Sequence, residues 1–305
     1  MLIQDKIFAN EMQKQAFVNL CELKFARKMN DLTDVIVKDP NERIITLSGP
    51  SCSGKTVTAR NIAHAVTRAG RRMFQLSIDD FYRPREELNR EAELLGREPD
   101  YDSVTSIDLE TLANVIRGIY RGDKVVCPLY DFNSGTRSES YTLNSSEVDV
   151  VLVEGIQAIY PEVTALFGGL PHISVSINIR SDLTVCGSEF SPRELRLMRR
   201  IVRDVRTRGT SPERTFHLWN VTVLPNEEKS ILPYENTAKI AIDSAMAYEP
   251  QVIRDLLLPA LETVPEESRY YSDARKLMEK VEPLQSIDPE YVPMESLYSE
   301  FLGRK

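Results

Sequence analysis

The chain has 305 residues, of which 42% are hydrophobic and 28% charged, and its net charge is −8. This length can bury one large α/β core or two smaller ones, and the negative charge repels nucleic acid and anionic membranes, so we expect neither as a partner. No apolar segment is long enough for a signal peptide or a membrane span, and the four cysteines and three histidines lack the spacing of disulfide frameworks or metal sites. The composition predicts a cytoplasmic protein.

The N-terminal part of the chain predicts a helical extension followed by a βαβ unit. In residues 1–40, apolar residues recur at helical spacing. Then come a buried strand, RIITLS (43–48), a glycine-containing loop, a helix, TVTARNIAHAVTRAG (56–70), and a second strand, RMFQLSI (72–78). A strand, a loop, a helix and a strand in this order predict a parallel sheet with a right-handed crossover.

The rest of the chain continues to alternate between helices and strands. Residues 81–105 are polar, and we expect them to be irregular. Further strands are predicted at 149–156, 172–179 and 239–246, and helices at 106–122, 191–208 and 211–219. Beyond about residue 260 prolines become frequent, which indicates a short helical extension packed on the core. We therefore predict three parts: an N-terminal extension (1–40), a central domain (41–260) and a C-terminal extension (261–305).

The loop after the first predicted strand fits the phosphate-binding pattern G-x-x-x-x-G-K-[ST]. Its glycines let backbone N–H groups surround a phosphate, Lys55 reaches the β- and γ-phosphate oxygens, and Thr56 offers a hydroxyl to Mg²⁺. The following helix adds the positive end of its dipole. The chain is therefore predicted to bind a nucleoside triphosphate, taken to be ATP with Mg²⁺. The loop residues predicted to bind it are Gly49, Ser51, Ser53, Gly54, Lys55 and Thr56.

Two carboxylates follow predicted strands at the same sheet edge as this loop. Asp79 lies in SIDDFY after the second strand, and Glu154 directly follows the apolar run VVLV. At this edge a carboxylate can take a proton from an acceptor hydroxyl or help to hold Mg²⁺. For Glu154 the alternative is a structural or helix-capping role, but a carboxylate after four apolar residues is costly to bury without a cation.

Residues 191–209, SPRELRLMRRIVRDVRTRG, are rich in arginine, with seven arginines in 193–208. On a helix five of these arginines share one face, and apolar residues share the opposite face. In a negatively charged protein with a phosphate-binding loop, this pattern predicts a mobile helical lid that closes arginines over the triphosphate. A solvent-exposed amphipathic helix and a nucleic-acid-binding patch are the alternatives.

Five motifs together resemble the uridine/cytidine kinase branch of the phosphoribulokinase/uridine kinase family. In the family's order they are SGPSCSGKT, SIDDFY, PLYDF (128–132), VLVEGIQAIY (151–160) and RRIVRDVRTRG (199–209). The resemblance covers about residues 43–250, and the tail is similar to that of bacterial uridine-kinase-like proteins. It implies an α/β P-loop NTPase-type fold with a parallel sheet flanked by helices and an arginine-rich lid. It also implies phosphoryl transfer from ATP to a nucleoside, and assembly into a homo-oligomer.

The resemblance assigns roles to the two carboxylates and to the metal site. Asp79 is implied to be the general base that takes the proton of a ribose 5′-hydroxyl, and its neighbour Asp80 has no such role. Thr56, Asp79 and Glu154 are implied to surround Mg²⁺. Lys55 is implied to act on the phosphates during transfer.

The resemblance also assigns the arginines and the acceptor contacts. Arg203 is implied to lie beside the acceptor and to take part in catalysis, whereas Arg200 and Arg208 are implied to contact phosphates. The residues implied to bind the acceptor are Tyr82, Tyr101, Asp102, Tyr130 and Arg203. Taken alone, each of these tyrosines could equally be a packing residue.

The acceptor-binding part departs from the family pattern. The base-recognising histidine of the family is replaced by Gly135, the H-P-x-A segment by SVTS (103–106), and the arginine after the lid's Arg-Gly by Thr210. We therefore expect intact machinery for phosphoryl transfer, with a nucleoside as the first candidate acceptor and Gly135→His as a change that increases pyrimidine use. Another sugar-like or pantothenate-like alcohol, and a non-catalytic regulatory module that binds nucleotide or RNA, are the alternatives.

Overall fold

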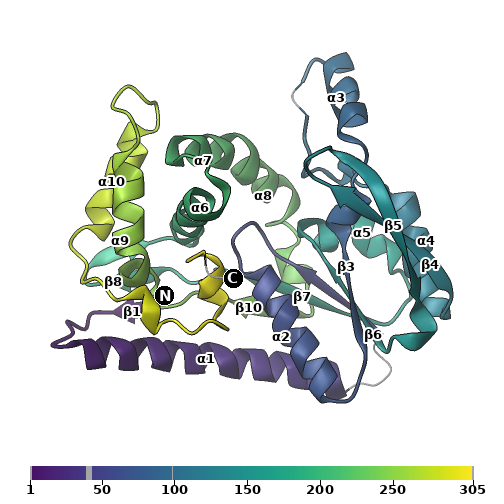
Figure 1. Ribbon diagram of the computed structural model, residues 1–305, viewed down its shortest axis with the longest axis horizontal. Helices are drawn as coiled ribbons and strands as arrows, with labels where there is room; N and C mark the ends of the chain where they lie inside the picture. The colour runs from purple at the N-terminus through teal and green to yellow at the C-terminus, as the bar shows by residue number, and fades with distance from the viewer. Residues whose placement is uncertain (1, 39–42, 98, 304–305) are drawn as a thin grey trace.

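The computed structural model describes residues 2–38, 43–97 and 99–303, and its centre is a five-stranded parallel sheet in the order β10-β7-β2-β6-β3 (Figure 1). Each strand lies within a segment that the sequence predicts as a strand, so the parallel α/β fold is confirmed. The strands are β2 (Ile44–Ser48), β3 (Met73–Ser77), β6 (Val150–Glu154), β7 (His172–Asn178) and β10 (Ile240–Asp243).

Helices cover both faces of this sheet. Successive side chains of a strand point to opposite faces, and in β2 Ile45 and Leu47 belong to one hydrophobic cluster and Ile44 to another. The first cluster includes side chains of α2 (Lys55–Arg68), α6 (Pro192–Arg208), α9 (Glu249–Glu262) and α10 (Tyr271–Val281). The second includes α4 (Leu109–Arg121) and α5 (Pro161–Leu166).

The predicted N-terminal helix is α1 (Glu11–Lys38), which runs along one side of the molecule (Figure 1). Its buried residues include Val18, Cys21, Phe25, Met29, Leu32 and Ile36. Two other apolar residues near its start, Ile7 and Met12, are 80% and 79% exposed, so only part of the apolar pattern forms core. β1 (Leu2–Gln4) pairs in parallel with β8 (Leu183–Val185), which pairs with β9 (Ser188–Phe190); this small sheet was not predicted.

The segment predicted to be irregular contains a helix, α3 (Arg85–Leu94). Only Leu88 and Ala92 are buried in it, which explains why its apolar periodicity is weak. A hairpin of β4 (Lys124–Asp131) and β5 (Thr136–Asn144) lies near α3, beyond the β3 edge of the sheet (Figure 1). The predicted helix 211–219 is longer than expected.

That helix begins as α7 (Pro212–Leu218), passes through a π-helical turn (Trp219–Val223) and continues as α8 (Leu224–Ser230). The C-terminal segment ends in 3-10 turns at Pro289–Tyr291 and Leu297–Glu300. Within the described ranges, no helix is long and apolar enough to cross a membrane.

Candidate active site

The loop that follows β2 is held tightly by its surroundings. A Cβ atom at Gly49 would lie 2.2 Å from the carbonyl oxygen of Ile177, so a larger residue would force the backbone apart. Gly54 has a φ of 101°, and a Cβ atom there would lie 2.3 Å from Cδ1 of Leu297. Because α2 begins directly afterwards at Lys55, the loop ends at the positive pole of a helix. The backbone therefore has the features of a phosphate-binding loop.

The ammonium group of Lys55 lies over its own loop. Its Nζ donates to the carbonyl oxygen of Gly49 at 2.7 Å and to that of Pro50 at 3.4 Å. Burial lowers the pKa of Lys55, and the charges of Glu154 and Asp79 oppose this shift. A desolvated cation that is held mainly by carbonyl oxygens favours an incoming anion, such as a nucleotide phosphate.

The two predicted carboxylates lie at the same sheet edge. Ser77, the last residue of β3, is in register with Glu154, the last residue of β6, and its Oγ donates to Glu154 Oε1 at 3.1 Å. Asp79 follows in a 3-10 turn (Ile78–Phe81). Burial, and to a smaller extent the charge of Glu154, raises the pKa of Asp79 to about 6, whereas Lys55 opposes this shift. A carboxylate with this pKa is suited to accept a proton near neutral pH.

The predicted magnesium ligands are an oxygen donor set that suits this ion. Asp79 and Glu154 repel each other, as the raised pKa of Asp79 shows, and a cation between them would relieve the repulsion. Within the described ranges, no group of three or more His, Cys, Asp or Glu side chains could hold a metal by itself. Two carboxylates with the hydroxyl of Thr56 instead fit Mg²⁺ that also binds nucleotide phosphates. This site stays a prediction.

The raised pKa of Asp79 predicts that its negative charge destabilises the empty protein. The pKa rises from 3.8 to about 6 on folding, so the folded state retains the proton between these values. The stabilising contribution of the protonated carboxyl is therefore fully present below the lower pKa and is lost as the pH rises through about 6. Thermal melts without nucleotide or metal can test this. As the pH rises from roughly 4 to 8, the free energy of unfolding of Asp79→Asn should increase by about 2–3 kcal/mol relative to that of wild type. A difference that is independent of pH would contradict the burial assigned to Asp79.

A cavity of about 230 Å³ opens beside the phosphate-binding loop. Its walls include Ser51 from the loop, Tyr101 and Asp102 from the segment after α3, and Arg200 from α6. Burial raises the pKa of Asp102, and a hydrogen bond from Asn226 opposes this shift. The structure thus brings four of the predicted site residues together, at the place where an acceptor would face a phosphate on the loop. Asn226 was not predicted.

Tyr82 and Tyr130 contact each other and are not among the residues lining this cavity. Their ring centroids are 5.6 Å apart, and the ring of Phe132 lies 5.0 Å from that of Tyr130. Gln157 Nε2 donates to Tyr82 Oη at 2.8 Å. The backbone N–H of Tyr130 donates to Asp80 Oδ1 at 3.2 Å, so Asp80 supports the hairpin. Contact of either tyrosine with the acceptor stays a prediction.

Arg85 packs against the position of the missing histidine. Gly135 has a φ of 73°, and a Cβ atom there would lie 2.8 Å from Cβ of Arg85. The backbone N–H of Arg85 donates to the carbonyl oxygen of Gly135 at 2.8 Å, and its guanidinium donates to that of Phe132 at 2.5 Å. A histidine at this position would strain the backbone and displace Arg85. The single change Gly135→His is therefore not the clean test of pyrimidine use that the sequence indicated.

The three α6 arginines predicted to contact phosphates (Arg200, Arg208) or the acceptor (Arg203) surround one carboxylate, Asp204. The shortest separations between guanidinium nitrogens and its carboxylate oxygens are 2.8 Å for Arg203, 3.4 Å for Arg200 and 3.5 Å for Arg208. Arg200 also donates to Ser51 Oγ at 2.9 Å. Arg200 therefore reaches the phosphate-binding loop, and Asp204 keeps the other two beside it. Their contacts with phosphates and acceptor stay predictions.

Two further arginines of α6 have a structural role. Arg199 is fully buried, forms an ion pair with Glu249, and donates to the carbonyl oxygen of Cys52 at 3.1 Å. Arg196 is also buried, forms an ion pair with Glu227, and donates to the carbonyl oxygen of Ser51 at 3.3 Å. These contacts fasten the N-terminal half of α6 to the loop. This half of the predicted lid is therefore a wall of the site in the present structure.

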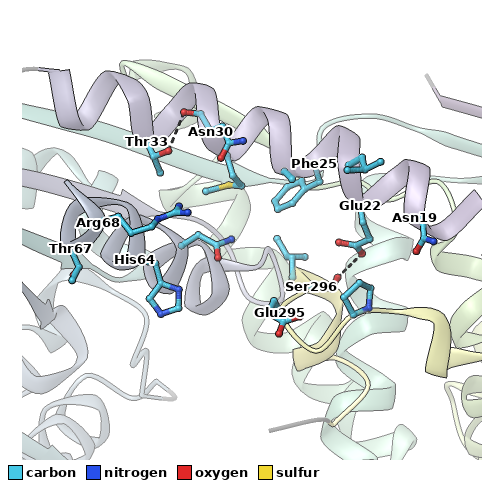
Figure 2. A pocket seen from close by; sticks show the side chains of 16 residues that line it. Asn19, Glu22, Phe25, Asn30, Thr33, His64, Thr67, Arg68, Glu295 and Ser296 are labelled. Carbon is cyan, nitrogen blue, oxygen red and sulfur yellow. Dashed lines mark hydrogen bonds between the residues drawn. The ribbon is translucent and has the colours of Figure 1, made fainter. Parts of the chain in front are cut away.

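The C-terminal segment covers the loop from the side of α1. Leu297 packs on Gly54, and Ser296 Oγ donates to Glu22 of α1 at 2.7 Å. Figure 2 shows Ser296 and Glu22 in the wall of a groove of about 880 Å³ between α1, α2 and this segment. None of the predicted site residues lines the groove. The smaller cavity, which Asp102 and Arg200 line, is therefore the candidate site.

Comparison with known proteins identifies similar sequences and folds. The model of the phosphoribulokinase / uridine kinase family matches residues 44–248. A uridine kinase of Ureaplasma parvum is 29% identical over 201 residues, which are 65% of this chain and 86% of that protein. Uridine-cytidine kinase B of Dictyostelium discoideum is 28% identical over 199 residues, or 65% and 73% of the two chains. The solved structure of a possible uridine kinase from Bacillus stearothermophilus has a similar fold, with a TM-score of 0.52 at 15% identity over 72% of this chain and 100% of that one.

Proposed function

The chain belongs to the phosphoribulokinase/uridine kinase family, and on this premise we propose that it transfers the γ-phosphoryl group of ATP to the 5′-hydroxyl of a ribonucleoside, with uridine or cytidine as first candidates. One observation carries the proposal: Lys55, Asp79 and Glu154 meet at one edge of the sheet, beside a cavity lined by Asp102 and Arg200. In this proposal Asp79 accepts the proton, and it lies near enough to Lys55 on the loop and to Asp102 in the cavity for both charges to affect its pKa. The similarity to a uridine kinase and to a uridine-cytidine kinase supports the choice of a nucleoside as acceptor.

The residues of the site account for each part of this reaction. Asp79 accepts the proton of the acceptor hydroxyl, whose oxygen forms a bond to the γ-phosphorus while the bond to the bridging oxygen of ADP breaks. Lys55 and Arg200 stabilise the negative charge on the transferring group. Mg²⁺ held by Thr56, Asp79 and Glu154 would supply further charge neutralisation at the phosphates.

A second acceptor class is favoured by one feature of the hairpin. Gly135 stands where the family pattern has a histidine that recognises the base, and Arg85 packs against it, so recognition of a pyrimidine has no support at this position. A sugar-like or pantothenate-like alcohol would need no such contact. The cavity and the carboxylates would serve it equally well.

Release of ADP from Mg·ATP in the presence of single acceptors distinguishes these candidates. The acceptors are uridine, cytidine, the purine nucleosides, pantothenate and ribulose 5-phosphate, and Lys55→Ala serves as the blank. Acceptor-dependent ADP release with uridine or cytidine supports the proposal. Release only with pantothenate or ribulose 5-phosphate identifies the second class. No release with any acceptor, although ATP binds, refutes a nucleoside acceptor and points to an acceptor outside this panel or to the non-catalytic regulatory module.

A further inference from the structure

Residues 297–303, which we call the terminal turn, pack against both the phosphate-binding loop and α6. In the 3-10 part of this turn, Leu297 packs on Gly54 at the start of α2. At the other end of the turn, a Cβ atom at Gly303 would lie 3.2 Å from Nε of Arg206 in α6. The terminal turn therefore joins the loop to the arginine-rich helix.

Two aromatic side chains fix the terminal turn on α6. Cζ of Arg199 lies 5.5 Å from the ring centroid of Tyr298 and 4.9 Å from that of Phe301, and both rings are buried. Arg199 also donates to the carbonyl oxygen of Cys52 in the loop, so one buried arginine holds the turn and the loop together. Glu300, which lies between the two aromatic residues in the chain, is thereby fixed in place.

The Glu300 carboxylate lies near two cations of the predicted active site. It is close enough to Lys55 and Arg203 for its charge to affect the pKa of each. Its Oε2 is buried and has no hydrogen-bond partner among the residues that the structure describes. Such an oxygen is unfavourable unless positive charge nearby compensates it. Lys55 and Arg203 supply this charge, and Glu300 in return supplies some of the negative charge that a phosphate would bring to them.

We propose that Glu300 is a residue of the nucleotide site that competes with the phosphates of ATP for Lys55 and Arg203; this rests on the ATP binding of the proposed function and not on the identity of the acceptor. In the empty protein the carboxylate neutralises part of the positive charge beside the loop. When ATP binds, its phosphates bring negative charge to the same place, and the carboxylate repels them. Glu300 therefore lowers the affinity for ATP, and ATP loosens the terminal turn from the loop. Glu300 lies outside residues 44–248, which the family model matches.

A purely structural role is the other account of Glu300. In that account the side chain only supports the terminal turn, which packs on Gly54 through Leu297. Its replacement then disturbs the loop and weakens ATP binding, or leaves it unchanged. Competition predicts the opposite sign, because removal of the charge tightens ATP binding.

The experiment measures the dissociation constant for Mg·ATP by calorimetry, without an acceptor, for wild type, Glu300→Gln and the matched control Glu295→Gln. Glutamine keeps the shape of the glutamate side chain and removes its charge. Glu295 is exposed in the same C-terminal segment and lines the separate groove beside α1. We expect Glu300→Gln to lower the dissociation constant about 3- to 30-fold and Glu295→Gln to leave it within about 2-fold of wild type.

The outcomes separate the inference from the function on which it rests. An unchanged or weaker affinity in Glu300→Gln, or an equal gain in Glu295→Gln, overturns the competition while ATP binding by wild type stands. A wild type that does not bind Mg·ATP refutes the nucleotide site itself, and the role of Glu300 with it.

If Glu300→Gln does not fold, hydrogen exchange of the wild-type protein decides. The backbone amides of Phe301, Leu302 and Gly303 donate hydrogen bonds within the terminal turn. Mg·ATP should raise their exchange rates about 10-fold or more, because the phosphates loosen the turn from the loop. Unchanged or slower exchange with Mg·ATP bound overturns the proposal.

Discussion

Replacement of Asp79 by asparagine is expected to lower kcat about 10²- to 10⁴-fold and to leave the dissociation constant for ATP within a few-fold of wild type. The carboxamide has nearly the same shape as the carboxylate but cannot accept the proton of the attacking hydroxyl. The phosphate-binding loop is not altered, because Asp79 lies in the turn after β3. Steady-state kinetics with a productive acceptor and ATP binding by calorimetry measure the two quantities.

Asp80→Asn provides the matched control for this variant. Asp80 is the next residue in the chain, and its Oδ1 accepts a hydrogen bond from the backbone N–H of Tyr130. An asparagine can keep that bond through its carboxamide oxygen, so kcat should stay within a few-fold of wild type. If Asp79→Asn turned over at nearly the wild-type rate, or if the two variants lost activity equally, Asp79 could not be the base.

Lys55→Ala is expected to lower kcat about 10²- to 10³-fold and to abolish most of the stabilisation that ATP gives to the folded protein. For wild type, ATP at about 100 times its dissociation constant should stabilise the fold by about 2.7 kcal/mol. Steady-state kinetics measure the loss of kcat, and thermal melts with and without Mg·ATP measure the loss of stabilisation by ATP.

Arg60→Ala controls for the loss of a cation from the same helix. Arg60 is exposed on α2. Its removal should leave the thermal shift with ATP and the turnover unchanged. A Lys55→Ala variant that retained the wild-type thermal shift would show that ATP does not bind at the predicted loop.

The sequence predicts the centre of the sheet well because the inner strands β2 and β6 are buried on both faces. Such strands are continuous apolar runs, as VVLV at 150–153 shows, and their short length and β-branched residues, rather than a period, distinguish them from a helix. The hairpin was missed because most of β5 is exposed and carries polar side chains. α3 was missed because only Leu88 and Ala92 are buried in it. Helices and strands that bury few apolar side chains have no clear apolar periodicity in their sequence.

The candidate site was predicted where the chemistry lies next to a strand end. Glu154 ends a recognisable strand, Asp79 lies just after another, and Lys55 lies at the end of the loop that follows a third; parallel strands bring their carboxyl ends together. Arg196 and Arg199 show the limit of this reasoning. Their pattern is the same as that of Arg200 and Arg203, but their partners Glu227 and Glu249 lie far away in the chain. The sequence around an arginine does not show whether a residue far away in the chain will pair with it and bury it.

Asn226 and Leu297 were missed for a related reason. Asn226 lines the cavity shortly after a π-helical turn, and no residue pattern in this segment predicts such a turn. Leu297, which lies near the C-terminus and 243 residues after Gly54, packs on that glycine. Only the folded chain brings these residues to the site.

The most direct test of the proposed reaction is the identity of the product formed from uridine and Mg·ATP, followed by phosphorus NMR and chromatography against authentic uridine 5′-monophosphate. We predict that ADP and uridine 5′-monophosphate form in equal amounts with wild type and that both form about 10²- to 10⁴-fold more slowly with Asp79→Asn. ADP without a phosphorylated nucleoside, or the same product from Asp79→Asn at the wild-type rate, would contradict transfer to a 5′-hydroxyl with Asp79 as the base.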